Sequence, residues 1–205
     1  MKKELYNIIV LKLRIIVGWW MNNQSRQALW LALAGSIVLM IGMGYGRFAF
    51  TGVLPLMLNE GLLTLHEGNL AASANYAGYL VGALLLARVQ PGAATRLSII
   101  SAGLTIASLA LLAWVSSPWT IITLRAVAGA LSAITLIAGS LWLLEHMGHH
   151  HGAPLLYAGV GLGIFISAEG IALGHALSLT SQQIWLLCAL CAGLLLALEI
   201  RWLLT

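Results

Sequence analysis

Four strongly polar side chains interrupt long apolar stretches of the chain: Arg47, Asn75, Arg125 and Glu169. Each stretch has the length of a membrane span. A charge near the centre of a bilayer costs about 3 kcal/mol, so such residues face the interior of a helix bundle or a water-filled cavity. A rise of about 1.5 Å per residue places all four roughly 5 to 9 Å to the outer side of the membrane midplane. We therefore take them as candidates for binding a solute or a proton.

The charges of these candidates indicate two kinds of chemistry. Two arginines and one glutamate leave excess positive charge, which attracts an anionic or carboxylate-bearing solute. Glu169 would also couple transport to protons if it alternately bound a proton and paired with an arginine. We expect Tyr76 to line the same space, together with Tyr45 and Tyr79. The alternative is an ion pair that only holds the bundle together.

The composition favours a lipid environment. Of the 205 residues, 60% are hydrophobic and 8% are charged, whereas soluble domains carry about a quarter charged residues. The net charge is +4, but the basic residues do not gather on one face, and five of the ten Lys and Arg lie in the first 26 residues. This distribution argues against nucleic-acid binding and indicates an orientation signal for a membrane protein.

Enzymatic chemistry has little support in the sequence. There is no GxSG motif, no phosphate-binding glycine loop and no zinc-type spacing of Cys and His, so we expect no catalytic residues, metal or cofactor. Cys188 and Cys191 form CxxC inside an apolar stretch and are interpreted as small packing residues. The tract from His146 to His151 is interpreted as a hydrated loop, with transition-metal binding as the alternative. His175 is a lone histidine near the outer end of its span and is interpreted as structural.

Hydropathy predicts an all-α polytopic membrane protein with six transmembrane helices. The predicted spans are residues 28–58, 68–87, 97–115, 119–144, 154–177 and 184–204, each of roughly the length a bilayer requires. Pro118 and Pro154 stand where helix starts tolerate proline. Residues 28–205 therefore form one transmembrane domain. Residues 1–27 form a cytoplasmic segment that is either an interfacial amphipathic helix or, in its first twenty residues, upstream of a true start at Met21.

The distribution of basic residues predicts the orientation of the chain in the membrane. Lys and Arg precede the first span, flank the loop after the second span (Arg88 and Arg96) and follow the sixth (Arg201). The loops 59–67, 116–118 and 178–183 contain neither residue type. The positive-inside rule then places both termini in the cytoplasm of a multi-pass inner-membrane protein.

Small residues recur at the spacing that lets membrane helices approach closely. They occur as GxxxG pairs or stripes in the first, second and fifth spans, with one more glycine in the fourth. The predicted packing glycines are Gly42, Gly46, Gly78, Gly82, Gly129, Gly159 and Gly163. They are expected either to pack helices tightly or to let them slide against one another.

Four stretches resemble the major facilitator superfamily, and specifically its YbfB/YjiJ-type branch. Residues 42–57 (GMGYGRFAFTGVLPLM) and 71–83 (AASANYAGYLVGA) are similar to the first two helices of that branch. Arg125 followed by Gly129 is similar to the R-x-x-x-G signature of the superfamily, and residues 157–164 to the fifth helix. The loop between the second and third spans departs from the pattern because it lacks the usual aspartate.

The resemblance implies the N-terminal six-helix half of a secondary active, proton-coupled carrier for a small solute. The solute would bind between this half and a second six-helix half, or between two copies in a homodimer. The alternative is a six-helix scaffold or accessory protein that transports nothing and whose polar residues only pack.

Overall fold

The computed structural model describes residues 23–203, and it describes side-chain surroundings for residues 26–200. Residues 1–22 lie outside this range, and with them the predicted interfacial helix and the choice between Met1 and Met21 as the start. Within residues 23–203 every regular element is a helix, with no strand. The predicted all-α class is confirmed for this part of the chain.

The described helices form long rods joined by short turns. The first rod is continuous from α2 (Asn23–Leu39) through the π-helix η1 (Met40–Phe48) to α3 (Ala49–Asn59). The others are α4 (Leu65–Leu85), α5 (Ala94–Leu112), α6 (Pro118–Leu141) with its π-helical extension η3 (Trp142–His146), α7 (Ala153–Ala176) and α8 (Ser181–Leu203). Single 3₁₀ turns, η2 (Pro91–Ala93) and η4 (His150–Gly152), precede α5 and α7.

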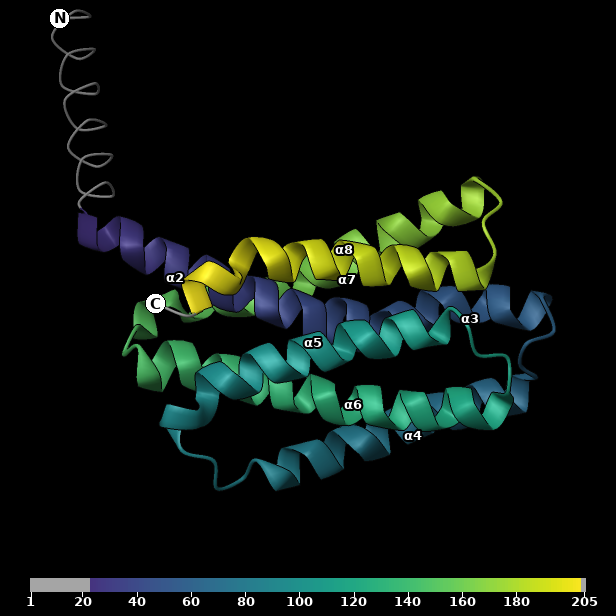
Figure 1. Ribbon diagram of the computed structural model, residues 1–205, viewed down its shortest axis with the longest axis horizontal. Coiled ribbons are helices and arrows are strands. Elements are labelled where there is room, and N and C mark those ends of the chain that lie inside the picture. The colour runs from purple at the N-terminus through teal and green to yellow at the C-terminus, as the bar shows by residue number, and fades with distance from the viewer. Residues whose placement is uncertain (1–22, 204–205) are drawn as a thin grey trace, which may run out of the picture.

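The rods run side by side in one bundle with the first rod near its centre (Figure 1). α4 packs against α6, and α6 also contacts α5 and η1. On the other side of η1, α2 and η1 pack against α7, while α8 lies on α5 and α2. The start of α2 and the end of α8 meet at the same end of the bundle (Figure 1).

Side-chain hydrogen bonds define the helix starts at the opposite end. Thr64 and Glu67 form a reciprocal capping box at the start of α4, which satisfies N–H groups that the helix itself cannot pair. Glu60, in the turn after α3, accepts the backbone N–H of Ser181 at 2.8 Å and also bonds the Ser181 hydroxyl. A carboxylate at a helix N-terminus is favourable, so Glu60 ties the first rod to the start of α8.

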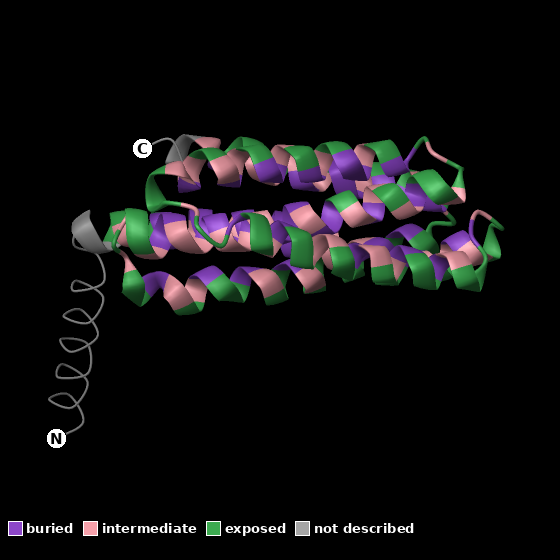
Figure 2. Cartoon of the chain, turned by 90° about the horizontal axis from the view of Figure 1, so that it is seen from below, coloured by how far each residue is buried: buried purple, intermediate pink, exposed green. Residues whose placement is uncertain are grey.

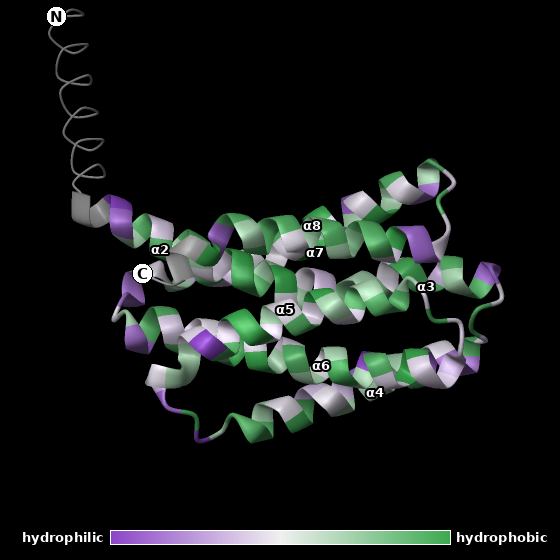
Figure 3. Cartoon of the chain, viewed as in Figure 1, coloured by the Kyte–Doolittle hydropathy of each residue, from purple (hydrophilic) through white to green (hydrophobic). Residues whose placement is uncertain are grey.

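The outer surface of the bundle suits a bilayer. Large apolar side chains such as Leu84, Leu85 and Leu198 are among the most exposed, and buried residues lie on the faces that the helices turn toward one another (Figure 2). Hydrophobic residues cover most of each rod, and hydrophilic ones gather mainly toward the two ends (Figure 3). In water such a surface would aggregate, whereas in lipid it contacts acyl chains. The chain is therefore a multi-pass membrane protein.

Five of the helical rods in the described chain are long and apolar enough to cross a membrane: Arg26–Asn59, Pro91–Leu112, Pro118–His146, His150–Ala176 and Ser181–Ile200. The predicted second span, 68–87, corresponds to α4, which is not among them. Its first half carries His66, Glu67, Asn69, Ser73 and Asn75, which lower its hydropathy. Five of the six predicted spans thus have the composition of a membrane helix. Composition therefore does not establish that the number of transmembrane helices is six.

Candidate functional site

The centre of the bundle is the π-helical segment η1, which contains Gly42, Gly44 and Gly46. A side-chain carbon added at Gly42 would meet Thr135 of α6, and one at Gly44 would overlap the backbone of Gly163 in α7. One added at Gly46 would meet Thr105 of α5. The three alternating glycines therefore let three different helices approach one segment. A π-helix places an extra residue in the helical hydrogen-bond pattern, and such segments are frequent at functional sites.

Arg125 of α6 reaches into this centre and is 1% exposed. Its two terminal nitrogens donate hydrogen bonds to the backbone carbonyls of Gly46 and Arg47, each at 2.9 Å. Its guanidinium lies over the ring of Phe50, 4.6 Å from the ring centroid. Arg125 therefore fixes the end of the π-helical segment, using charge-assisted bonds that are stronger than neutral ones.

Asn75 joins α4 to the same centre. The side chain is 4% exposed, and its Nδ2 donates a 2.9 Å hydrogen bond to the backbone carbonyl of Arg125. A side-chain carbon added at Gly129 would overlap the carbonyl of Asn75, so the two backbones touch at this level. The structure thus brings Asn75, Arg125 and the carbonyl of Arg47 together.

The side chain of Arg47 has a different environment. It is half-buried, and its guanidinium lies 4.1 Å from the ring centroid of Tyr79, 5.1 Å from that of Tyr76 and 5.6 Å from that of Phe48. Among the described residues it makes no hydrogen bond or ion pair. Aromatic faces attract a guanidinium but leave its N–H groups free in the plane. The aromatic rings therefore position the guanidinium of Arg47, whose N–H groups can still donate hydrogen bonds to an anion.

Two arginines close together without a carboxylate give this centre a positive potential. The terminal nitrogens of Arg125 donate hydrogen bonds to backbone carbonyls. Among the described residues, the guanidinium of Arg47 contacts only aromatic rings. A site of this kind can bind an anion and orient it by hydrogen bonds, with aromatic rings beside it. Among the described residues around the two arginines, no nucleophile is paired with a base, as covalent catalysis would require.

A family model described as "Uncharacterised MFS-type transporter YbfB" matches residues 39–205. The chain belongs to this family of MFS-type transporters. The resemblance seen in the sequence is thereby confirmed, and membership implies a membrane transporter in place of an enzyme. A search of curated proteins and a search of solved structures gave no significant match.

In this MFS-type chain Glu169 does not join the arginines, contrary to the prediction that it faces them. Its side chain is exposed on α7, and neither arginine contacts it. Two residues along a helix turn the side chain by about 200°, and Ser167 and Ile171 on either side are buried. The predicted depths did not determine which way each side chain faces, because that depends on rotation about the helix axis. The stripe of Gly159, Gly163 and Ser167 is the sequence signal that places Glu169 on the opposite face.

Tyr76 lies beside Arg47 as expected, whereas Tyr45 does not. Tyr76 contributes its ring to the Arg47 site while remaining 62% exposed, so it stands at the edge of the site. Tyr45 is 4% exposed and belongs to the apolar core, not to the polar space. The rings of Phe48 and Phe50, which contact the two arginines, were not predicted, although each lies within three residues of Arg47.

A ladder of hydroxyl groups around η1 was also missed by the sequence analysis. The Ser132 hydroxyl donates a 2.8 Å hydrogen bond to the carbonyl oxygen of Gly42. The Thr135 hydroxyl donates a 2.9 Å hydrogen bond to the hydroxyl oxygen of Ser101. The signal was present in α5, where Ser98, Ser101, Thr105 and Ser108 recur at helical spacing. Hydrogen bonds of this kind join membrane helices in the transporter without adding charge.

The seam between α4 and α6 contains three of the predicted packing glycines. A side-chain carbon added at Gly78 would overlap the carbonyl of Ala126, and one at Gly82 the carbonyl of Ala130. Gly159 and Gly163 bring α7 equally close to Ser36 and Met40 of the first rod. These positions hold α4, α6 and α7 around the arginines at backbone contact.

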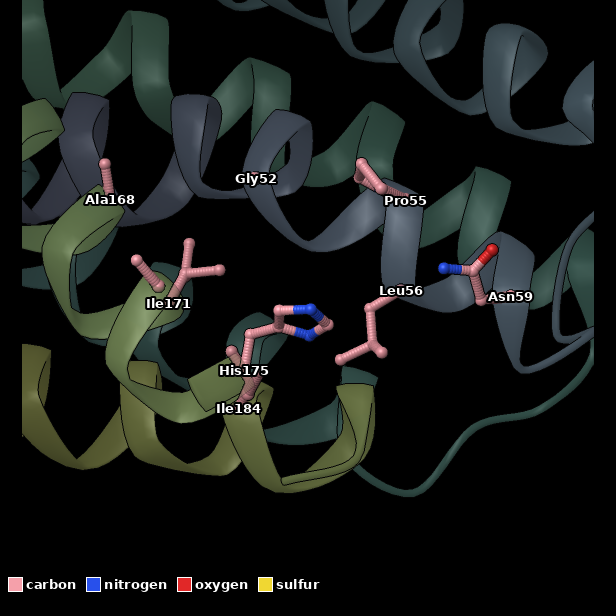
Figure 4. Close-up of a pocket in the computed structure, with 9 residues that line it drawn as sticks. Gly52, Pro55, Leu56, Asn59, Ala168, Ile171, His175 and Ile184 are labelled. Atoms are coloured by element: carbon pink, nitrogen blue, oxygen red, sulfur yellow. The ribbon is translucent and has the colours of Figure 1, made fainter. Parts of the chain in front are cut away.

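A hollow lies between α3 and α7, toward the end of the bundle away from the termini. Its volume is about 310 Å³, and Figure 4 shows the imidazole of His175 and the amide of Asn59 among apolar side chains of both helices. Pro55 and Ile171 contribute to its wall. His175 was expected to be structural, but the structure places it at the edge of this open hollow.

Proposed function

We propose that this chain is a secondary active transporter of a small organic anion and that Arg47 binds the anionic group. The observation that carries the proposal is the free guanidinium of Arg47, half-buried beneath Tyr79 at 4.1 Å, with no acceptor among the described residues. A buried cation without a counter-ion is costly in the membrane. An incoming carboxylate would relieve that cost and could accept two parallel hydrogen bonds.

The neighbouring residues take supporting roles in this proposal. Arg125 and Asn75 are positioning residues, because one fixes the backbone beside Arg47 and the other fixes the backbone of Arg125. Tyr76 is exposed at the edge of the site, where a solute would pass. The second positive charge of Arg125 adds to the potential that attracts an anion.

Proton coupling is proposed to depend on Glu169. In the described conformation this carboxylate is exposed and contacts neither arginine, so coupling requires a conformation in which α7 turns or moves. Transport measured against pH should then lose its pH dependence in Glu169→Gln. An unchanged pH profile in that variant removes Glu169 from the coupling role.

The proposed architecture follows the family. The helices surround the arginines on one side, and a second helical unit would cover the other. Alternating access would then be rocking of the two units about the glycine seams. Both termini are proposed to face the cytoplasm, with the protein in the inner membrane.

Binding can be tested before the solute is identified and without a transport assay. We would measure the melting temperature of the purified protein in detergent with a panel of small monocarboxylates and their uncharged amides. Some carboxylate, but not its amide, should stabilise the wild type. Arg47→Gln should abolish this shift, while Arg88→Gln, which removes an exposed arginine from the turn after α4, should retain it.

The competing function is a scaffold that transports nothing. It is favoured by Arg125, whose hydrogen bonds all go to backbone within the described chain, as a purely structural residue would do. Uptake into vesicles separates the two. If Arg47→Ala leaves uptake of every stabilising carboxylate unchanged and only lowers the folded yield, the scaffold replaces the carrier.

A further inference from the structure

A buried carboxylate on the other side of the bundle takes no part in the proposed transport site. Glu199 lies near the end of α8 and is 2% exposed, and neither of its carboxylate oxygens has a hydrogen-bond partner among the described residues. Leaving a buried charge unpaired is among the most costly arrangements in a protein. Glu199 is therefore expected to have a partner from outside the described residues.

Glu199 lines a groove of about 300 Å³ between α2 and α8. The rest of the lining is apolar: Trp30, Leu33, Ala34, Ile37 and Leu198. Ligand pockets range from roughly 300 to 1,000 Å³, so this groove suits a small group. Leu198 and Trp30 are 71% and 48% exposed, which leaves the groove open to the surroundings of the bundle.

The groove lies at one membrane boundary. The polar residues 23–27 (NQSRQ) precede the apolar stretch of the first rod, and Arg201 follows Glu199 in the sequence of α8. Glu199 and Trp30 are therefore within a few residues of the level where acyl chains give way to headgroups. α8 lies on the opposite side of the bundle from α4 (Figure 1), so the groove is separate from the Arg47 site.

We propose that this groove binds the headgroup of an aminoethyl phospholipid, phosphatidylethanolamine, with its ammonium on Glu199. A primary ammonium has three N–H donors, which match two carboxylate oxygens without partners in the described chain. The apolar walls would receive the first carbons of the lipid. A choline headgroup carries the same charge but no N–H, and a glycerol headgroup carries no cation to neutralise Glu199.

Arg26 provides charge complementarity for the other half of the headgroup. It is exposed and precedes Trp30 by one helical turn on the same stripe of α2 as Ala34 and Ile37. The separation along the axis is about 6 Å. The groove thus has a carboxylate for the ammonium, and the exposed guanidinium of Arg26, one turn from Trp30, would be available to a lipid phosphate.

The test compares lipids that differ only in their N–H groups. The detergent-solubilised protein would be mixed with equal amounts of phosphatidylethanolamine and phosphatidylcholine of identical acyl chains, and retained lipid would be measured by native mass spectrometry. Wild type should retain the ethanolamine lipid about tenfold more, as a charge-assisted hydrogen bond implies. The N-methyl and N,N-dimethyl lipids should fall between.

Glu199→Gln should bring the retention ratio close to one. Glu145→Gln, which changes an exposed carboxylate in η3, is the matched control and should keep the wild-type ratio. The wild-type comparison needs no variant, so it decides the matter even if Glu199→Gln does not fold. Equal retention of the two lipids by wild type overturns the proposal, as does a preference that survives in Glu199→Gln or disappears in Glu145→Gln. Displacement of the lipid by an equal concentration of soluble phosphoethanolamine would also overturn it, because the occupant would then be a free amine.

Discussion

At the scale of single residues, the two membrane arginines do different work. Arg125 is buried and bonds two backbone carbonyls, whereas Arg47 lies among aromatic rings with its donors free of described partners. The sequence presents both as arginines in apolar helices at similar depth. The difference arises because the side chain of Arg125 points at the π-helical segment, whose backbone supplies its acceptors.

Arg125→Lys should destabilise the protein although it keeps the charge. A lysine ammonium lacks the planar fork that reaches the carbonyls of Gly46 and Arg47 together, and one buried carbonyl would lose its partner. Such a loss costs about 1 to 3 kcal/mol, so the melting temperature in detergent should fall by roughly 2 to 12 °C. Arg88→Lys, in an exposed turn, is the control and should melt with the wild type. A matching melting temperature for Arg125→Lys would mean that one hydrogen bond suffices.

At the scale of elements, the glycine seams determine how closely the helices surround the arginines. The α4 and α6 backbones touch where Gly129 meets Asn75, and again at Gly78 and Gly82. In a membrane no hydrophobic effect draws helices together, so close packing and hydrogen bonds must hold them. The fold therefore requires residues without a side chain at these positions, so that the two backbones can touch.

Gly129→Ala should lower both the melting temperature and the yield of folded protein. The added carbon would overlap the carbonyl of Asn75, and backbone cannot give way as a side chain can. Gly103→Ala, inside α5, is the matched control, because no described atom lies within 4 Å of the added carbon. The control should be neutral or stabilising, since alanine favours a helix over glycine by about 1 kcal/mol. Equal effects of the two changes would show that the seam tolerates separation.

The start of α4 should show a pH-dependent stability. The backbone N–H and the hydroxyl of Thr64 donate to Glu67 and lower the pKa of its carboxyl from the ordinary 4.5. A lowered folded-state pKa stabilises the protein above the unfolded value, and this contribution is lost as the pH falls through the folded value. Wild type should therefore melt above Glu67→Gln at pH 7, and the two curves should converge below about pH 4.5. A gap that persists at low pH would contradict the assignment.

At the scale of the whole molecule, the bundle has an internal positive site beside α4 and a separate groove beside α8. The exposed apolar surface between its two polar ends is that of a membrane protein (Figures 2 and 3). Among the long rods of the described chain, α4 is the one without the composition of a membrane span, and its packing on α6 places it alongside helices that are apolar enough to span. We therefore expect α4 to cross the membrane despite its composition.

Cysteine labelling should establish the crossing of α4 and the orientation together. In a background of Cys188→Ala and Cys191→Ala, His66→Cys at the start of α4 should react with an impermeant maleimide applied outside intact cells. Gln90→Cys, in the turn that follows α4, should react only after the membrane is opened. Both positions are exposed. Labelling of both from the same side would mean that α4 does not span, and reversed labelling would invert the proposed orientation.

The fold class and much of the site could be predicted from the sequence for a simple physical reason. A run of apolar residues fixes which segments enter lipid, and a constant helical rise fixes the depth of each polar residue within it. Arg47, Asn75 and Arg125 were accordingly predicted at one level, and the structure places Asn75 and Arg125 in contact there. The short motifs around Gly42 and Tyr157 were sufficient to indicate the family.

The sequence by itself determined the membrane class and the family, and it predicted a common depth for the candidate residues. The tertiary structure decided which way each side chain faces, because rotation about a helix axis depends on which neighbours its small residues admit. It separated Glu169 from the arginines, placed Tyr79 over Arg47 and gave Arg125 backbone acceptors at the end of a π-helical segment. It also buried Glu199 without a partner in the described chain. This burial arises where α2 and α8 pack together, and the hydropathy of a single helix contains no information about how two helices pack.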